Sequence, residues 1–162
     1  MPEMGRIVQI NLSDGGVPKL PVARAEVTTL GLVGDRQQNL KYHGGPDRAL
    51  CLWSLEVIET LQQEGHPIAP GCTGENLTLA GLDWATMGPG SLIQLGDAVQ
   101  IAITDYAAPC RKNMRWFSDR RFSRMGQKHY PGSSRLYARV LQGGPLQTGD
   151  LVMVLPAALQ AP

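Results

Sequence analysis

Short runs in which apolar and polar residues alternate dominate the chain, and they predict strands. Alternation with a period of two places every second side chain on the same face of a sheet. It is clearest in residues 91–104, "SLIQLGDAVQIAIT", where Gly96-Asp97 separates two apolar runs and predicts two antiparallel strands joined by a turn. Gly-Asp recurs at 34–35 and 149–150, and each pair is expected to mark a tight turn. Residues 146–154 are expected to contribute a closing strand.

Other segments are assigned by their length and by the residues that bound them. Residues 6–13, 24–35 and 75–82 predict extended chain, and 48–53, "RALCLW", predicts a short strand buried on both faces. Residues 54–65, "SLEVIETLQQEG", predict a helix. Ser54 can cap its start, Leu55, Ile58 and Leu61 share one face, and Gly65 stops it.

For two later segments the pattern does not decide the secondary structure. Residues 115–125 are compatible with a helix, and "RLYARVLQ" at 135–142 suits a strand or a helix equally. The chain therefore holds seven or eight short strands and one or two helices, and strand follows strand more often than it alternates with helix. That order favours a β-rich α+β fold, a mostly antiparallel barrel, as a single domain over residues 1–162.

Composition adds that the chain of 162 residues, with 43% hydrophobic and 18% charged residues, can build a core. No apolar run approaches the ~20 residues that span a bilayer, and the first residues lack the order of a signal peptide. The three cysteines are an odd number with no C-x-x-C spacing. We expect a cytoplasmic protein with free thiols and no membrane partner.

Charge is segregated along the chain. Residues 111–128 hold seven basic side chains and one acid, whereas the remaining residues hold eight basic and thirteen acidic ones. The segment is either a solvated helical face or a local anion site. Trp116 and Phe117 could stack on nucleic-acid bases, but the chain as a whole is not basic and has no nucleic-acid motif, so no nucleic-acid partner is expected.

Cys110 is the first candidate for chemistry. In "DYAAPCRKNMRWF", residues 105–117, it follows Pro109 at the end of an apolar strand and precedes Arg111 and Lys112. Nearby cations favour the thiolate, the form that attacks electrophiles or binds soft metals. The alternative is that Cys110 fills the core as a small apolar residue. We assign Cys51, inside an apolar strand, to the core, and expect Cys72, in a Gly-rich loop, to be exposed and a second candidate for sulfur chemistry.

Two polar stretches are the other candidates. In "KYHGGPDRA", residues 41–49, two glycines and a proline make a turn whose backbone N–H groups can face an anion, or a turn that Asp47 merely stabilises. In "GCTGENLTL", residues 71–79, Asn76 offers a donor and an acceptor that suit an amide-rich heterocycle such as a pterin. Alternatively, Glu75 and Asn76 close a loop.

The order and spacing of "HGGPDRAL", "TGENLTLAGLDW", "LGDAVQIAIT" and "APC" followed by a cation resemble the MOSC domain, named after the C-terminal domain of molybdenum cofactor sulfurases. The resemblance covers about residues 30–112, and the tail "SRLYARVLQGGPLQTGDLV" is similar to stand-alone bacterial members. It implies a barrel-like domain with a cysteine at the mouth of a pocket. In relatives that bind the molybdenum cofactor, this cysteine ligates the metal beside the pterin dithiolene.

Carried over to this chain, the resemblance makes Cys110 the catalytic residue and the molybdenum ligand. It implies a molybdenum-molybdopterin cofactor, and it leaves pyridoxal phosphate open as a ligand. In larger eukaryotic relatives an additional N-terminal β-barrel domain supplies part of the basic residues for the cofactor phosphate, and segment 111–128 is expected to take that role. The residues assigned to cofactor binding are Asn76, Glu75, Thr73, His43, Asp47, Arg48, Lys41, Arg111 and Lys112.

Three functions are compatible with these residues. The preferred one is an oxidoreductase that reduces N-hydroxylated compounds at molybdenum, with a small-molecule substrate and electrons from a separate donor protein. The second is a sulfur carrier that holds a persulfide on Cys110 and works with a sulfur donor or acceptor protein. The third is a small-molecule binding domain without turnover. Whichever applies, we expect His43, Asp47, Asn76 and Cys110 to line one cleft.

Overall fold

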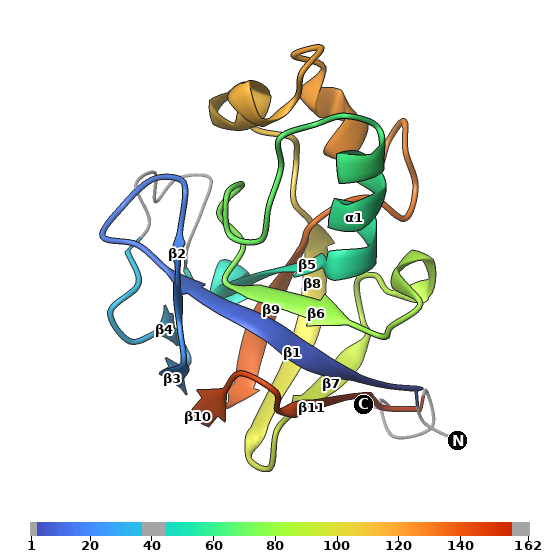
Figure 1. Ribbon diagram of the computed structural model, residues 1–162. Helices are drawn as coiled ribbons and strands as arrows, with labels where there is room; N and C mark the ends of the chain where they lie inside the picture. Colours follow the sequence, from blue (N-terminus) through green and yellow to red (C-terminus); the bar gives the residue numbers. More distant parts are fainter. Residues whose placement is uncertain (1–2, 37–44, 157–162) are drawn as a thin grey trace.

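The computed structural model describes residues 3–36 and 45–156, and its strands form a closed barrel (Figure 1). Each barrel strand pairs on both sides, which leaves the barrel without an open edge. Only β5 and β6 pair in parallel, and every other barrel pair is antiparallel. The seven barrel strands, in their order around it, are β1 (Glu3–Leu12), β11 (Leu151–Val154), β7 (Leu92–Leu95), β8 (Val99–Tyr106), β9 (Leu136–Gln142), β5 (Leu50–Ser54) and β6 (Leu77–Ala80). The predicted fold class is confirmed.

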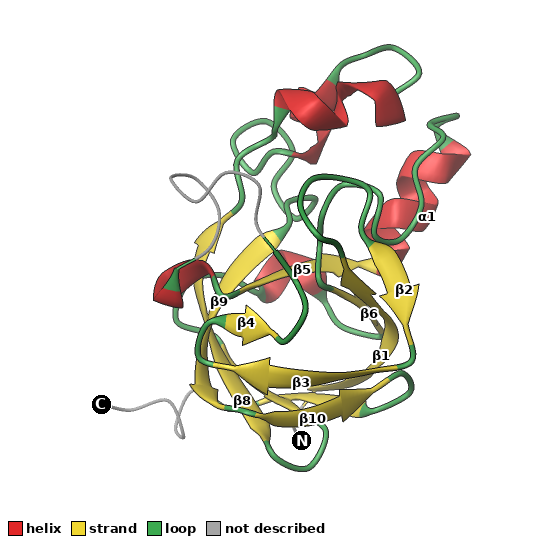
Figure 2. Cartoon of the chain, turned by 90° about the vertical axis from the view of Figure 1, so that its left-hand side faces the viewer, coloured by secondary structure: helices red, strands yellow, loops and turns green. Residues whose placement is uncertain are grey.

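The other strands lie outside the barrel. Strand β2 (Leu20–Val22) pairs with the end of β1. A separate sheet holds β10 (Gly144–Gln147), β3 (Arg24–Thr28) and β4 (Gly31–Leu32) in that order, and it covers one side of the barrel (Figure 2).

The hairpin predicted for residues 91–104 is confirmed. β7 and β8 are antiparallel with Leu95 opposite Val99, and Gly96 in the turn has φ +60°. Residues on β8 alternate between buried and partly buried from Val99 to Thr104, as the sequence pattern predicts. The buried set, with its counterparts on the other strands, fills the barrel with aliphatic side chains.

The predicted helix is α1 (Leu55–Gln63), and it lies against the outside of β5 and β6 (Figure 1). The Ser54 hydroxyl accepts a hydrogen bond from the Val57 amide at 3.2 Å, and Gly65 just past the helix has φ +96°. Ile58 and Leu61 are buried against the barrel. Because α1 covers them, β5 and β6 are buried on both faces, as expected for β5 and usual for parallel pairs.

The structure corrects three assignments of extended chain or helix. Residues 24–35 form the hairpin β3–β4, because the chain turns at 29–30. Only β11 closes the barrel. Gly144–Gln147 joins the separate sheet, because the chain reverses at Gly149 (φ +94°) and Asp150 accepts a hydrogen bond from the Gln147 amide. Of residues 135–142, for which strand and helix were equally suited, Leu136–Gln142 form strand β9.

The third correction concerns residues 115–125. They form no continuous helix but lie in two 3-10 segments, Arg111–Trp116 and Phe122–Met125, at one end of the barrel (Figure 2). Phe117 is extended and turns inward to the core, and Arg120 has φ +63°, which no right-handed helix allows. Burial of Phe117 therefore outweighs local helix propensity here.

Candidate functional site

The end of β8 presents Cys110. Strand pairing runs one residue beyond β8, because the Ala107 amide donates to the Arg135 carbonyl at 2.9 Å. Cys110 then begins the 3-10 segment, and its carbonyl accepts from the Asn113 amide at 2.9 Å. Its side chain is partly exposed. The backbone on both sides of this thiol is thus held by hydrogen bonds while the sulfur stays accessible.

The other two thiols are buried. Burial raises the pKa of Cys51 to about 11, partly offset by Arg135, and raises the pKa of Cys72 to about 12, partly offset by a hydrogen bond from the Ala69 amide. Cys51 is a core residue, as assigned from the sequence. The expectation that Cys72 is exposed is wrong, since its loop folds inward and its sulfur accepts the Ala69 N–H at 3.3 Å. Cys110 is therefore the accessible thiol of the three.

A tyrosine and two arginines lie near Cys110. Tyr137 on β9 stands opposite Cys51 on β5, and the Arg48 guanidinium lies 5.1 Å from the centre of its ring. Burial raises the pKa of Tyr137, the thiols of Cys51 and Cys110 raise it further, and Arg135 and Arg48 oppose them. Four groups are thus within electrostatic range of the Tyr137 phenol. We call these four groups and Tyr137 the thiol cluster: Arg48, Cys51, Cys110, Arg135 and Tyr137.

Arg135 connects this cluster to the loops beneath it. Its two terminal nitrogens donate at 3.0 Å to the carbonyls of Thr73 and Ala108, and the Asn113 amide nitrogen donates to the same Thr73 carbonyl at 3.1 Å. Both side chains are buried, yet Arg135 Nε and Asn113 Oδ1 have no hydrogen-bond partner. An orphaned donor and an orphaned acceptor close behind Cys110 are suited to a bound polar group or water.

The turn of the "HGGPD" element is fastened next to the thiol cluster. Asp47 is exposed and accepts from Arg139 Nε on β9 at 2.8 Å, and its carbonyl accepts from Thr104 on β8. These contacts hold Arg48 over Tyr137. Lys41 and His43 lie outside the described residues, so the predicted cleft that includes His43 stays a prediction.

The "GENLT" element lies below the surface and forms a buried polar cluster. Asn76 is fully buried, and its side chain accepts from the Cys51 amide at 3.0 Å and donates to Asp35 at 2.9 Å. Glu75 accepts from the Gly71 amide at 2.9 Å and from the hydroxyls of Thr73 and Thr78 at 3.2 Å. Burial raises the pKa of Glu75, against these donors and Arg135. The side-chain partners of Asn76 and Glu75 are protein atoms of the surrounding strands and loops.

An ion pair completes that buried polar cluster. Lys19 Nζ lies 2.6 Å from Asp35 Oδ2, and both side chains are about 95% buried. A buried pair of this kind costs desolvation and is kept stable by further hydrogen bonds. Asp35 receives them from Asn76 and from the Ser13 amide. In the structure Glu75 and Asn76 hydrogen-bond within the protein and hold their loop, which is the alternative considered in the sequence analysis. Direct ligand contact by Thr73, Glu75 or Asn76 stays a prediction.

Arg111 and Lys112 are exposed directly after Cys110, as the sequence implies. The aromatic residues that follow are not free to stack on bases. Phe117 is buried and packs on His66, with ring centres 5.0 Å apart, and the Arg115 guanidinium covers the Trp116 ring at 4.6 Å.

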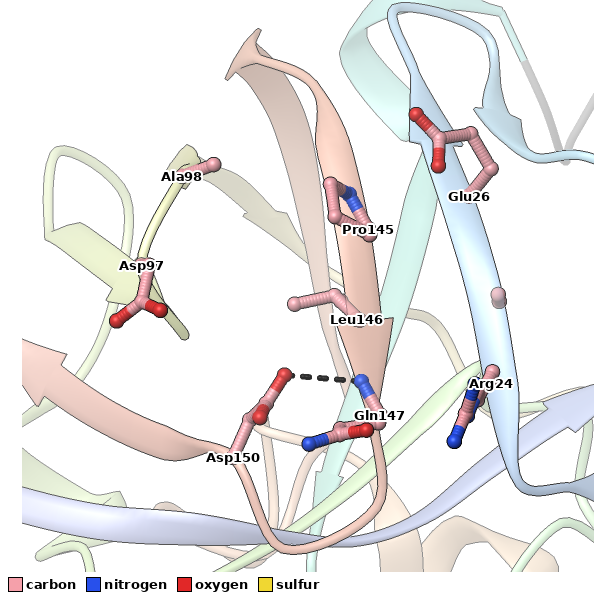
Figure 3. Close-up of a pocket in the computed structure, with 9 residues that line it drawn as sticks. Arg24, Glu26, Asp97, Ala98, Pro145, Leu146, Gln147 and Asp150 are labelled. Carbon is pink, nitrogen blue, oxygen red and sulfur yellow. Dashed lines mark hydrogen bonds between the residues drawn. The ribbon is translucent and has the colours of Figure 1, made fainter.

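Two cavities lie at the end of the barrel that carries Cys110, and a third lies at the other end. One of about 280 Å³ lies between residues 106–109, which lead to Cys110, and the segment around Gly126 to His129. A second, of about 660 Å³, is lined by polar side chains that include Glu64, His66, Arg121 and His129. The third, of about 560 Å³, has carboxylates from Glu26, Asp97 and Asp150 around it (Figure 3). This third cavity adjoins the start of β8, whereas Cys110 follows its end, so roughly 25 Å of strand separates them.

The sequence did not single out Arg135, Tyr137 or Asn113. The available signal was the alternation in "SRLYARV", which places Arg135, Tyr137 and Arg139 on one face of a strand, although only Arg139 of the three is exposed. Their relation to Cys110 comes from the pairing of β8 with β9, which a single segment does not reveal.

A small mixed barrel with a half-exposed cysteine at a strand end defines the class of protein. The family model of the MOSC domain matches residues 39–153, and the chain belongs to the MOSC domain family. It is 32% identical over 118 residues to the uncharacterized protein YflK of Bacillus subtilis, covering 72% of this chain and 52% of YflK. It is 38% identical over 91 residues to YiiM of Escherichia coli, covering 53% of this chain and 40% of YiiM. The chain thus spans about half the length of the curated relatives it matches.

Solved structures agree with this fold. The YiiM structure from Geobacillus stearothermophilus superposes with a TM-score of 0.71 at 25% identity, covering 94% of this chain and 75% of that one. The YuaD protein of Bacillus subtilis gives 0.73 at 17% identity, covering 95% and 97%, and this likeness concerns the fold alone. No helix within residues 3–36 and 45–156 is long and apolar enough to cross a membrane.

Proposed function

We propose that this MOSC protein binds the molybdenum cofactor through Cys110 and reduces N-hydroxylated compounds. The observation that carries the proposal is the contrast among its thiols: Cys110 is accessible at a strand end, while Cys51 and Cys72 are buried with raised pKa values. Thiolate sulfur is a soft ligand suited to such a metal.

The residues around Cys110 fit the cofactor. Among the described residues, no three His, Cys, Asp or Glu side chains gather as a metal site. A metal here would thus take Cys110 from the protein and its remaining sulfur ligands from the pterin dithiolene. The dithiolene and phosphate are anionic, and Arg48, Arg135, Arg111 and Lys112 supply positive charge around the thiol. Arg135 Nε is a buried hydrogen-bond donor that has no acceptor among the described residues.

When bound, the cofactor supplies a metal that exchanges two electrons and accepts oxygen. The overall reaction, R–NH–OH + 2 e⁻ + 2 H⁺ → R–NH₂ + H₂O, breaks the N–O bond and consumes two protons. Of the chain's own groups, Cys110 anchors the metal, and Arg48 and Arg135 hold negative charge beside it. Tyr137, whose pKa burial raises above its ordinary value, is protonated at neutral pH, so its phenol can hold a proton near the thiol.

Metal content tests the proposal. The protein is produced in a host that makes the cofactor, and molybdenum and pterin are measured for the wild type, Cys110→Ser and Cys51→Ser. We expect about one molybdenum per chain in the wild type and in Cys51→Ser, and a loss of tenfold or more in Cys110→Ser. Equal metal in all three proteins would overturn the assignment of Cys110.

A persulfide carrier is the second candidate, since the same accessible thiol favours it. In that case purified protein holds sulfur that cyanide releases as thiocyanate, and Cys110→Ser abolishes it while molybdenum is absent from every variant. The two candidates therefore differ in what the same three proteins contain.

A further inference from the structure

The positive charge of the chain is gathered at the end of the barrel that carries Cys110. Residues 111–128, which we call the basic cap, hold seven basic side chains and one acid, while the remaining chain has an excess of five acids. The cap lies at one end of the barrel beside α1 (Figure 1). The opposite end, at the turn between β7 and β8, has the carboxylates of Asp97 and Asp150 at its cavity (Figure 3).

Four of the seven cations of the cap make no ion pair with the residues that the structure describes. Arg124 forms an ion pair with Glu64, with nitrogen–oxygen distances of 2.9 and 2.7 Å, and Arg115 donates to the Val17 carbonyl at 2.9 Å. Four exposed side chains of the cap make no ion pair with any residue in 3–36 or 45–156: Arg111, Arg120, Arg121 and Lys128. Like charges held together repel one another and raise the positive electrostatic potential over this surface. An anionic partner that binds there relieves the repulsion.

The cap is nonetheless fixed and not a loose charged loop. Phe117 and Met125 are buried in the core, and Ser118 donates its amide to His66 Nδ1 at 3.2 Å. Gly126 packs so closely on Pro109 that an added Cβ would lie 2.6 Å from the proline ring. The exposed cations are therefore carried by a scaffold that is anchored to the residue before Cys110.

The basic cap also borders a cavity. The cavity of about 660 Å³ opens in the cap, with Arg121, Ser123, His129 and Tyr130 along it. A projecting side chain of a partner can enter it and meet donors. Glu64 in the same cavity is already paired with Arg124, and the one acid of the cap, Asp119, accepts from the Arg121 amide.

A protein fits this surface better than a nucleic acid. Base stacking needs open aromatic faces, and Phe117 is buried while Arg115 covers Trp116. The basic cap therefore presents an array of cations around the cavity. This array complements a patch of carboxylates on a partner protein.

We propose that the basic cap is the docking face for an acidic electron-carrier protein that delivers the two electrons of the proposed reduction next to Cys110. The inference rests on the proposed function, since the chain's reaction consumes electrons from outside. The carrier gives up two electrons, as one two-electron or two one-electron transfers, and the substrate N–O bond takes them up.

The test measures binding to the full chain prepared without metal, so that docking is read independently of the cofactor. The probes are a flavodoxin and a plant-type ferredoxin, both acidic carriers, and cytochrome c as a basic carrier of similar size. We expect both acidic carriers to bind at low salt and weaken at least tenfold between about 20 and 200 mM salt, because screening acts over ~10 Å. Cytochrome c should not bind.

Variants then locate the surface. Arg120→Gln/Arg121→Gln/Lys128→Gln should lower the affinity for the acidic carriers at least tenfold at low salt. The matched control, Arg6→Gln/Arg24→Gln/Arg36→Gln, removes three exposed cations outside the cap and should change the affinity less than twofold. Because these side chains are exposed, both variants should fold, which circular dichroism checks.

The outcomes separate the two proposals. Failure of both acidic carriers to bind, or equal loss of affinity in the cap and control variants, overturns the docking face even if the protein holds molybdenum. Cap-dependent binding by protein that never holds molybdenum supports the docking face and overturns the reductase.

Discussion

The buried polar cluster and the thiol cluster meet where Asn76 accepts from the Cys51 amide, yet they use polar side chains in opposite ways. Asn76, Glu75 and Asp35 direct their hydrogen-bonding groups to atoms of the surrounding strands and loops. At the thiol cluster, Cys110 is partly exposed, and Arg135 Nε and Asn113 Oδ1 lack partners. Satisfied polar groups hold loops in place, whereas unsatisfied ones beside an accessible thiol are available to a ligand. From this comparison we propose that "GENLT" supports the site and that the ligand binds at the strand end that carries Cys110.

The largest expected difference between the two regions is in thiol reactivity. At pH 8 a thiol with a pKa of about 11, such as Cys51, is ionised in about one molecule in a thousand, and burial blocks the reagent as well. We expect a neutral maleimide to label Cys110 alone in native protein and all three thiols in urea, as read by peptide mass spectrometry. Labelling of Cys72 as fast as Cys110 would remove the contrast.

The second-largest expected effect is the loss of stability when the Asn76 side chain is removed. Asn76→Ala leaves the buried Cys51 amide without an acceptor and removes one of the hydrogen bonds to Asp35, which keeps Lys19 and the Ser13 amide. Because a buried unsatisfied group costs about 1–3 kcal/mol, the free energy of unfolding should fall by about 3 kcal/mol in urea titrations. Gln63→Ala, an exposed amide on α1, should stay within about 0.5 kcal/mol of wild type. If Asn76→Ala kept full stability and lost only ligand binding, Asn76 would belong with the thiol cluster.

The pH dependence of stability sharpens the contrast between a buried and a surface carboxyl. Burial raises the pKa of Glu75 in the folded state, so the native protein holds that proton more tightly than the unfolded chain. Its contribution to stability is therefore full below the ordinary carboxyl pKa and declines as pH rises above it. The hydrogen bond from Arg124 lowers the pKa of Glu64, whose contribution is lost as pH falls.

Stability measured from pH 3 to 8 checks both signs. Glu75→Gln should remove a component that falls with rising pH, and Glu64→Gln should remove one that rises. The same change of slope in both variants would contradict the environments described for them.

The smallest expected effect concerns the cation above Tyr137. Removing it in Arg48→Gln should lower the rate at which anionic iodoacetate alkylates Cys110, relative to neutral iodoacetamide, by about twofold to fivefold, since one partly solvated charge contributes about 1 kcal/mol or less. Arg6→Gln, outside the cluster, should leave the ratio unchanged. An unchanged ratio in Arg48→Gln would place Arg48 outside the electrostatic surroundings of the thiol.

Local pattern determined much of this molecule. The alternation in residues 91–104 and the Gly-Asp turns specify the β7–β8 hairpin, because side-chain period and turn geometry act over a few residues. Ser54 and Gly65 bound α1 for the same reason. The motifs were specific enough to indicate the MOSC family, and the position of Cys110 after a strand and a proline predicted an exposed thiol.

Tertiary structure decided the rest, because burial depends on which distant segments meet. Cys72 and Asn76 sit in a stretch that reads as a polar loop, and only the packing of that loop against β1 and β5 buries them. Phe117 breaks the expected helix because the core takes its ring. Arg135 and Tyr137 come close to Cys110 only because β9 pairs with β8 and β5. The free energy of this pairing comes from contacts between residues far apart in the chain, so a local sequence pattern does not reveal it.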